Sequence, residues 1–125
     1  QHTCAITTNG TLRCWGWNVD RQAAVPSNLG PVTAVTAGIS HTCALTTTAG
    51  VRCWGLNSDG QARVPANLGR VTAVGAGRWH TCAVTTNRIV RCWGDNWVNQ
   101  VNVPSDLAPA TAVTGGEQYT CAATM

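Results

Sequence analysis

The 125-residue sequence has no lysine, no phenylalanine and a single tyrosine, and only 10% of its residues are charged. No apolar run approaches the roughly 18 residues that a membrane-spanning helix requires, so we expect no membrane span. The eight arginines are spread along the chain and form no basic stripe or patch of the kind that binds nucleic acid. We therefore expect no nucleic-acid partner.

Residue sets that carry common catalytic or metal chemistry are also missing. We find no Ser-His-Asp set, no paired carboxylates and no glycine-rich phosphate loop. A zinc site needs four closely spaced ligands, and a histidine two residues before a cysteine does not supply them. We expect a non-catalytic protein without cofactor or metal.

What the sequence does contain is a 39-residue repeat that runs through the chain without insertions. His-Thr-Cys occurs at residues 2–4, 41–43 and 80–82, and Tyr-Thr-Cys follows at 119–121; Cys-Trp-Gly occurs at 14–16, 53–55 and 92–94. Glutamine recurs as Gln22, Gln61 and Gln100. Such self-similarity is typical of repeat architectures. The chain is thus one repeat domain, 1–125, with units 2–40, 41–79 and 80–118 and the start of a fourth, 119–125.

Each repeat predicts three β strands, which in the middle of the chain are 32–37, 41–47 and 51–56. These segments are rich in Thr, Val and Trp, which favour pleated strands. Turn residues such as Asn9-Gly10 and Ala49-Gly50 separate them. We expect an all-β fold, for which a β-solenoid is the alternative to a propeller.

Six of the seven cysteines fall into three pairs with ten-residue spacing: Cys4 and Cys14, Cys43 and Cys53, and Cys82 and Cys92. Two strands joined by a three-residue turn would place the members of a pair opposite each other, near disulfide distance. We predict three disulfides within hairpins, each worth about 2–3 kcal/mol. Disulfides indicate an oxidising compartment and hence an extracellular or cell-surface protein. Three reduced, packed pairs in a cytosolic protein are the alternative.

Both ends of the sequence interrupt the repeat. The partner expected for Cys121 would stand ten residues later, beyond Met125, and no Val-Thr-Ala-Val strand precedes His2. We therefore expect Cys121 to be unpaired and the chain to be a fragment of a larger ring or array. Asn9-Gly10-Thr11 is a glycosylation sequon on a predicted turn, so Asn9 is a candidate glycan site.

The segments Ala-Gly-Ile-Ser-His-Thr-Cys-Ala-Leu, 37–45, and Val-Arg-Cys-Trp-Gly-Leu-Asn-Ser-Asp-Gly-Gln, 51–61, resemble the repeat of the regulator of chromosome condensation family. The short Val-Pro spacer is similar to the compact secreted bacterial form of that family, which includes a β-lactamase-inhibiting propeller. The resemblance implies one propeller blade per repeat. Gly60 follows the family pattern, but the equivalent positions in the first and third repeats hold Arg21 and Asn99. Tyr119 also departs from the pattern, because it stands at a position where histidine is usual. Propellers close with about four to eight blades, so roughly three blades make a partial β-propeller.

The residues that recur and those that do not have different expected roles. The recurring tryptophans and histidines are expected to be structural, because a catalytic group is not normally repeated once per blade. Side chains that break the repeat are the candidates for binding: Trp17, Arg78, Trp79, Trp97 and Tyr119. Trp, Tyr and Arg dominate interface hot spots, so these residues are expected on a propeller rim.

Three functions are compatible with these patterns. The first is a non-catalytic extracellular protein-interaction propeller that binds a protein partner. The second is a structural building block of a cell-surface or appendage filament, in which the chain binds copies of itself. The third is a carbohydrate-binding propeller, with a glycan held against tryptophan between blades.

Overall fold

The computed structural model describes residues 1–125 and consists of β strands, turns and loops. The strands are β1 (His2–Ile6), β2 (Leu12–Gly16), β3 (Val32–Ala37), β4 (His41–Thr46), β5 (Val51–Gly55), β6 (Val71–Ala76), β7 (His80–Thr85), β8 (Val90–Gly94), β9 (Ala110–Gly115) and β10 (Thr120–Thr124). Nothing in the structure is a helix with the length and apolar character needed to cross a bilayer.

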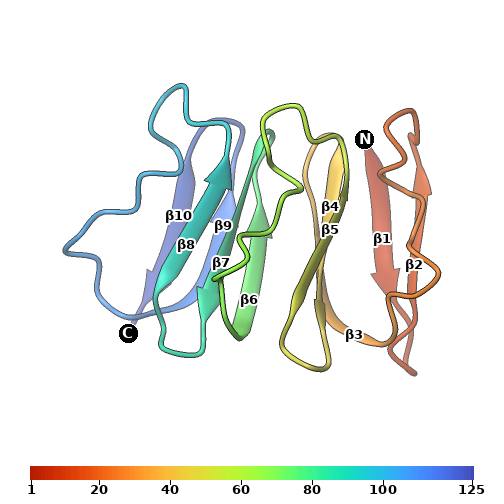
Figure 1. The fold of residues 1–125 in the computed structure, drawn as a ribbon, viewed down its shortest axis with the longest axis horizontal. Helices are drawn as coiled ribbons and strands as arrows, with labels where there is room; N and C mark the ends of the chain where they lie inside the picture. The colour runs from red at the N-terminus through yellow and green to blue at the C-terminus, as the bar shows by residue number, and fades with distance from the viewer.

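The ten strands form four antiparallel sheets that follow one another along the chain. Two sheets have three strands, β3-β4-β5 and β6-β7-β8, and two flanking sheets have two strands, β1-β2 and β9-β10. The sheets stand side by side in chain order, and each passes to the next through a long loop (Figure 1). This architecture confirms the predicted all-β partial propeller. Each complete blade has three strands in place of the four that are typical of propellers.

The observed strands agree with the predicted segments to within one residue. The differences lie where β4 ends at Thr46 and β5 ends at Gly55. Thr47 already belongs to the turn and donates its N–H to Pro31 O (3.2 Å), and Gly55 has φ of 103°, which takes the chain out of the sheet. The sheets are also offset from the sequence units, because β3 falls in unit 2–40 but pairs with β4 of the next unit.

The hairpins have the three-residue loop that the cysteine spacing requires. Thr46 N–H donates to Gly50 O (2.9 Å), which closes the loop, and Cys43 pairs with Cys53 in the ladder. The third loop residue, Ala49, has φ of 66°. This left-handed residue completes the usual three-residue hairpin turn.

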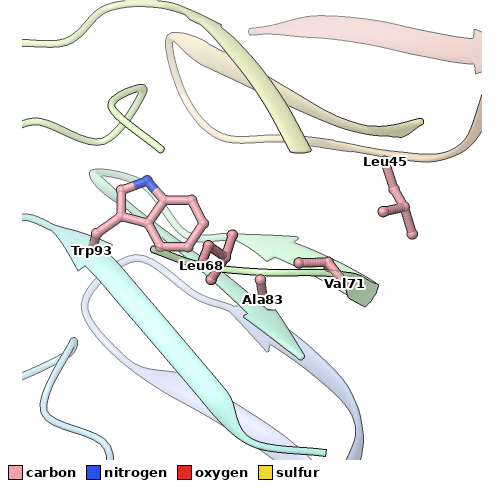
Figure 2. Close-up of a cluster of buried hydrophobic side chains, with 5 residues drawn as sticks. All are labelled: Leu45, Leu68, Val71, Ala83 and Trp93. Atoms are coloured by element: carbon pink, nitrogen blue, oxygen red, sulfur yellow. The ribbon is translucent and has the colours of Figure 1, made fainter. Parts of the chain in front are cut away.

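The core lies between the sheets, in three apolar clusters that repeat along the chain. The middle strands β4 and β7 are buried at five consecutive positions, because sheets pack on both sides of them. By contrast, the outer strands β1 and β10 each have one well-exposed face. Figure 2 shows the central cluster, where the Trp93 indole lies beside Leu68 in line with Ala83 and Val71.

Candidate interaction surface at one rim of the blades

A ladder of buried polar groups joins each sheet to the next. His41 Nε2 lies 2.9 Å from Thr81 Oγ1, and the Thr81 hydroxyl donates to Gln61 O at 2.8 Å. The same contacts recur between the neighbouring sheets, from His2 to Thr42 (2.6 Å) and from His80 to Thr120 (2.9 Å). The recurring histidines are therefore structural, as the repeat indicates. Their ring partners are threonine hydroxyls of the following sheet, and these hydroxyls in turn bind backbone.

The ladder determines which ring nitrogen of each histidine carries the proton. Because the Thr81 hydroxyl hydrogen is directed to Gln61 O, Thr81 Oγ1 must accept a hydrogen from His41 Nε2. His41 Nδ1 is buried and has no hydrogen-bond partner. Burial, together with the charges of His80 and His2, lowers the pKa of His41 to about 4. The ring is consequently neutral near pH 7 and is held in place as a hydrogen-bond donor.

Glycine is required beside this imidazole. A Cβ on Gly38 would lie 2.5 Å from His41 Nδ1 and 2.7 Å from Gly77 O, which is closer than real Cβ contacts. The same arrangement recurs one repeat later, where Gly77 lies against the His80 ring. The small-Gly turn before each His-Thr-Cys motif therefore makes room for the ring of that motif.

The recurring tryptophans pack between the sheets and use their indole N–H groups there. Trp54 Nε1 donates to Gln22 O (3.0 Å), and Trp93 Nε1 donates to Gln61 O (3.1 Å). Trp93 is only 8% exposed, whereas Trp15 is 54% exposed because no sheet precedes its own. These contacts occupy the apolar faces and N–H groups that a glycan stacked between blades would need.

Gln22, Gln61 and Gln100 recur in the sequence without an evident role, and the structure supplies one. Gln22 and Gln61 are fully buried, and each binds the loop that leads to it through its side-chain oxygen. Each backbone carbonyl accepts both the threonine hydroxyl and the indole N–H in the complete blades. The repeat spacing was the signal for these residues, but their acceptor role depends on contacts between units.

The six paired cysteines lie at disulfide distance within their hairpins. The S–S distances are 2.06 Å for Cys4–Cys14, 2.10 Å for Cys43–Cys53 and 2.05 Å for Cys82–Cys92, and each pair has a Cα–Cα distance of 4.1 Å. Strand register produces this proximity, because each pair stands directly opposite in its ladder. Cys121 is exposed and unpaired.

Strand register also places all the non-recurring aromatic residues at one end of the blades. His41 pairs with Gly55 and His80 with Gly94, so residues before β4 or β7 and after β5 or β8 share an end. That end also holds the N-terminus, and the turns that join β1 to β2, β4 to β5 and β7 to β8 lie at the other (Figure 1). We call the five candidates there the aromatic rim: Trp17, Arg78, Trp79, Trp97 and Tyr119.

Three members of the aromatic rim are linked across the last two sheets. The Arg78 guanidinium lies 5.3 Å from the centre of the Trp79 ring and forms an ion pair with Glu117, and Arg78 N–H donates to Gly116 O (3.0 Å). The Tyr119 ring packs on the backbone of Gly116. This turn-to-turn contact fixes Arg78 between Trp79 and the loop that carries Tyr119.

Trp97 reaches the same region through Asp95. Trp97 N–H donates to Asp95 Oδ1 (3.2 Å), and Asp95 N–H donates to Trp79 O (3.0 Å). Trp97 is the most exposed of the large apolar side chains, at 87%. Trp17 also lies at this end but on the first sheet, where its N–H donates to Gln1 O. The structure thus groups four of the five candidates and leaves Trp17 apart.

Asn9 lies at the opposite end, in the turn between β1 and β2. It is exposed, and its Oδ1 accepts a hydrogen bond from Thr11 N (3.3 Å). Its Nδ2, the atom to which a glycan attaches, makes no hydrogen bond. A glycan at Asn9 would leave the aromatic rim uncovered.

The fold and the buried ladder define a class of protein, an arc of β-propeller blades with a cysteine pair in each hairpin. The family model of the regulator of chromosome condensation (RCC1) repeat matches residues 1–22, 32–61 and 71–100. The chain belongs to this repeat family. Among curated protein sequences, none matches this chain.

Solved structures support the same fold. Prp20p from Saccharomyces cerevisiae superimposes with a TM-score of 0.86 at 18% identity, over 97% of this chain and 41% of that one. The CRINKLY WD40 ectodomain of the Arabidopsis thaliana receptor kinase ACR4 gives 0.77 at 24% identity, over 97% and 47%. Human WBSCR16 gives 0.84 at 16% identity, over 99% and 42%. The chain spans less than half the length of each of these proteins, and identities this low establish the fold alone.

Proposed function

We propose that this chain is part of a non-catalytic extracellular propeller that binds a protein partner through the aromatic rim. One observation carries the proposal: the large side chains that break the repeat gather at one end of the blades. Trp97, Tyr119 and Trp17 are 87%, 61% and 56% exposed. Trp, Tyr and Arg provide most interface hot spots, so exposed residues of these types support an interaction site.

Relatives with this fold bind proteins, which supports the same class of function. Prp20p has binding properties toward Gsp1p and histones, and yeast RCC1 (Prp20) binds Kap60. The extracellular placement is supported by three cysteine pairs at disulfide distance and by two receptor-kinase ectodomains among the structural neighbours. Peptide mapping without reductant tests the extracellular placement. Free thiols at the six paired cysteines would contradict it.

The binding test compares the rim with the opposite end of the blades. The native chain, a Trp97→Ala/Tyr119→Ala variant and an Ile89→Ala control are immobilised and exposed to secreted and cell-surface proteins of the source organism. Ile89 is a matched control because it is 56% exposed and lies in the hairpin turn between β7 and β8. Loss of a hot-spot residue costs about 2 kcal/mol or more, which is roughly a 30-fold loss of affinity.

A partner retained by the native chain and the control but released by the rim variant is the expected result. Equal retention of the partner by all three proteins would show that the aromatic rim does not bind it. A filament role would appear as fibres of the native material in electron micrographs. A carbohydrate role would appear as binding on a sugar array that is lost with Trp97→Ala.

A further inference from the structure

The end of the blades opposite the aromatic rim gathers most of the arginines. We call it the turn end, because it holds the turns that join β1 to β2, β4 to β5 and β7 to β8 (Figure 1). The loop before β6 also reaches it, since Thr86 N–H donates to Arg70 O there (3.0 Å). Five of the eight arginines lie in these turns, on the strands just after them or in that loop: Arg13, Arg52, Arg70, Arg88 and Arg91. They are dispersed along the sequence, but the fold brings them to one end.

Acidic residues are concentrated at the rim. Four of the five lie in the loops after β2, β5 and β8 or in the turn before β10: Asp20, Asp59, Asp95 and Glu117. The fifth, Asp106, belongs to the loop before β9, and its neighbours in that loop line a pocket with the β7–β8 turn. Five arginines and one aspartate give the turn end a formal side-chain charge of +4, whereas three arginines and four acidic residues give the rim −1. No arginine of the turn end forms an ion pair, because the ion pair between Arg78 and Glu117 lies at the rim.

Two grooves of the same construction cross the turn end, one on each three-stranded sheet. The first, of about 320 Å³, lies between the loop before β3 and the β4–β5 turn. The second, of about 190 Å³, lies between the loop before β6 and the β7–β8 turn. Their polar linings correspond at the repeat spacing and share two threonines and an arginine, which are Thr46, Thr47 and Arg52 in the first groove and Thr85, Thr86 and Arg91 in the second.

The shared arginine of each groove lies against an asparagine of the adjacent loop. Arg52 Nη2 is 3.5 Å from Asn28 Oδ1, and Arg91 Nη2 is 3.3 Å from Asn67 Oδ1. A guanidinium group has five N–H donors, so this contact positions the group and leaves most of its donors for a ligand. The second groove adds Arg70, at the position that Pro31 occupies in the first groove.

These linings favour an anionic ligand with a repeating structure. Guanidinium groups bind sulfate and carboxylate oxygens through charge-assisted hydrogen bonds, and threonine hydroxyls supply further donors. No aromatic residue lines either groove, so nucleic-acid bases would have no surface on which to stack. A site that recurs once per blade fits a polymer whose charged groups recur along its length, which the surface of a folded protein does not offer.

We propose that the turn end binds a linear acidic polysaccharide, which carries sulfate or carboxylate groups on its sugars and lies across the two grooves. Arg52 and Arg91 each bind one anionic group, and Arg70 binds a further group in the second groove. The threonine hydroxyls donate to neighbouring oxygens of the sugar chain. This site lies at the opposite end of the blades from the aromatic rim, so it does not depend on the function proposed for the rim.

The test measures the binding of fluorescein-labelled dextran sulfate to the full chain by fluorescence anisotropy, with neutral dextran as the blank. An Arg52→Gln/Arg91→Gln variant removes one charge from each groove. We expect it to lose about tenfold or more in affinity for dextran sulfate, because each guanidinium makes charge-assisted hydrogen bonds with the polymer. Arg52→Gln and Arg91→Gln alone should each lose part of the affinity.

The matched control is an Arg21→Gln/Arg63→Gln variant, which removes the same charge from exposed side chains in the rim loops. Arg21 N–H donates to Asn18 O and Arg63 N–H to Gly60 O there. Its affinity should change less than about twofold at physiological salt, which screens charges beyond about 8 Å. The Trp97→Ala/Tyr119→Ala variant should bind dextran sulfate as the native chain does, so failure of either proposed site is distinguishable from failure of the other.

Equal losses of affinity in the two double arginine variants would overturn the proposal, because binding would then follow net charge alone. A loss confined to one of the two single variants would overturn a site that spans both grooves. Tighter binding of duplex DNA than of dextran sulfate would overturn the polysaccharide as the ligand.

A measurement on the unaltered chain remains decisive if a variant does not fold. Phenylglyoxal modifies accessible guanidinium groups, and mass spectrometry of the digested chain locates them. Bound dextran sulfate should protect Arg52 and Arg91 and leave Arg21 and Arg63 reactive. Uniform protection of all four arginines, or protection of none, would contradict the proposed site.

Discussion

Acidification is expected to weaken the folded chain through His41, which the structure holds neutral between two sheets. Burial lowers the pKa of His41 to about 4, whereas an unfolded histidine titrates near 6.5. Between these values the unfolded chain binds a proton that the folded chain does not, so the free energy of unfolding falls as the pH falls from 6.5 toward 4. Above pH 6.5 His41 is neutral in both states, so its unfavourable effect on the free energy of unfolding is absent there.

The magnitude follows from the separation of the two pKa values. At about 1.4 kcal/mol per pH unit, His41 alone is expected to remove about 2–3 kcal/mol from the free energy of unfolding between pH 7 and pH 4.5. Burial lowers the pKa of His80 and of His2 as well, which acts in the same direction. A small domain has a total stability of about 5–15 kcal/mol, so this loss is readily measured.

The assay is urea unfolding at several pH values between 7 and 4.5, followed by tryptophan fluorescence. The comparison is a His41→Gln variant, whose side-chain amide can still donate to Thr81 Oγ1 but does not titrate. Carboxylate titration is common to both proteins and cancels in the difference. The native chain should lose about 2 kcal/mol more than the variant on acidification. Parallel stability curves for the two proteins would refute the assignment of a neutral, buried His41.

Three further substitutions follow from the repeat. Arg21→Gly should raise the free energy of unfolding by about 0.5–1 kcal/mol, measured as a shift of the urea midpoint, because Arg21 has φ of 61°, which glycine adopts without strain. Gly38→Ala should lower it by about 3 kcal/mol, seen as early thermal unfolding, because the added methyl group would overlap the neighbouring imidazole. Leu56→Asp should stabilise by about 1 kcal/mol in the same urea assay, because the buried Gln61 Nε2 has no partner, whereas Gln100 Nε2 donates to Asp95 at the equivalent position (2.7 Å).

The residues with positive φ show that the sequence can predict the repeat motif without predicting the backbone conformation of each turn. Arg21 and Asn99 stand where the repeat has Gly60, and all three have φ between 61° and 77°. The fold therefore keeps the turn and accepts the strain of non-glycine residues. A departure from the motif predicts a weaker turn at that blade without changing its geometry.

The sequence by itself determined the repeat, the strand positions to within a residue and the cysteine pairs, because these depend on contacts within one hairpin. A ten-residue spacing and a three-residue loop leave a single register, so Cys43 must face Cys53. The resemblance to a known repeat family, which the family model confirms, added the propeller arrangement.

Only the tertiary structure decided which residues make contacts between blades. The partner of His41 is Thr81, 40 residues away, and the acceptor for the Trp93 indole is the carbonyl of Gln61. No spacing within one unit fixes such contacts, since they depend on how adjacent sheets pack. The same packing gathers Arg78, Trp79, Trp97 and Tyr119 at one rim.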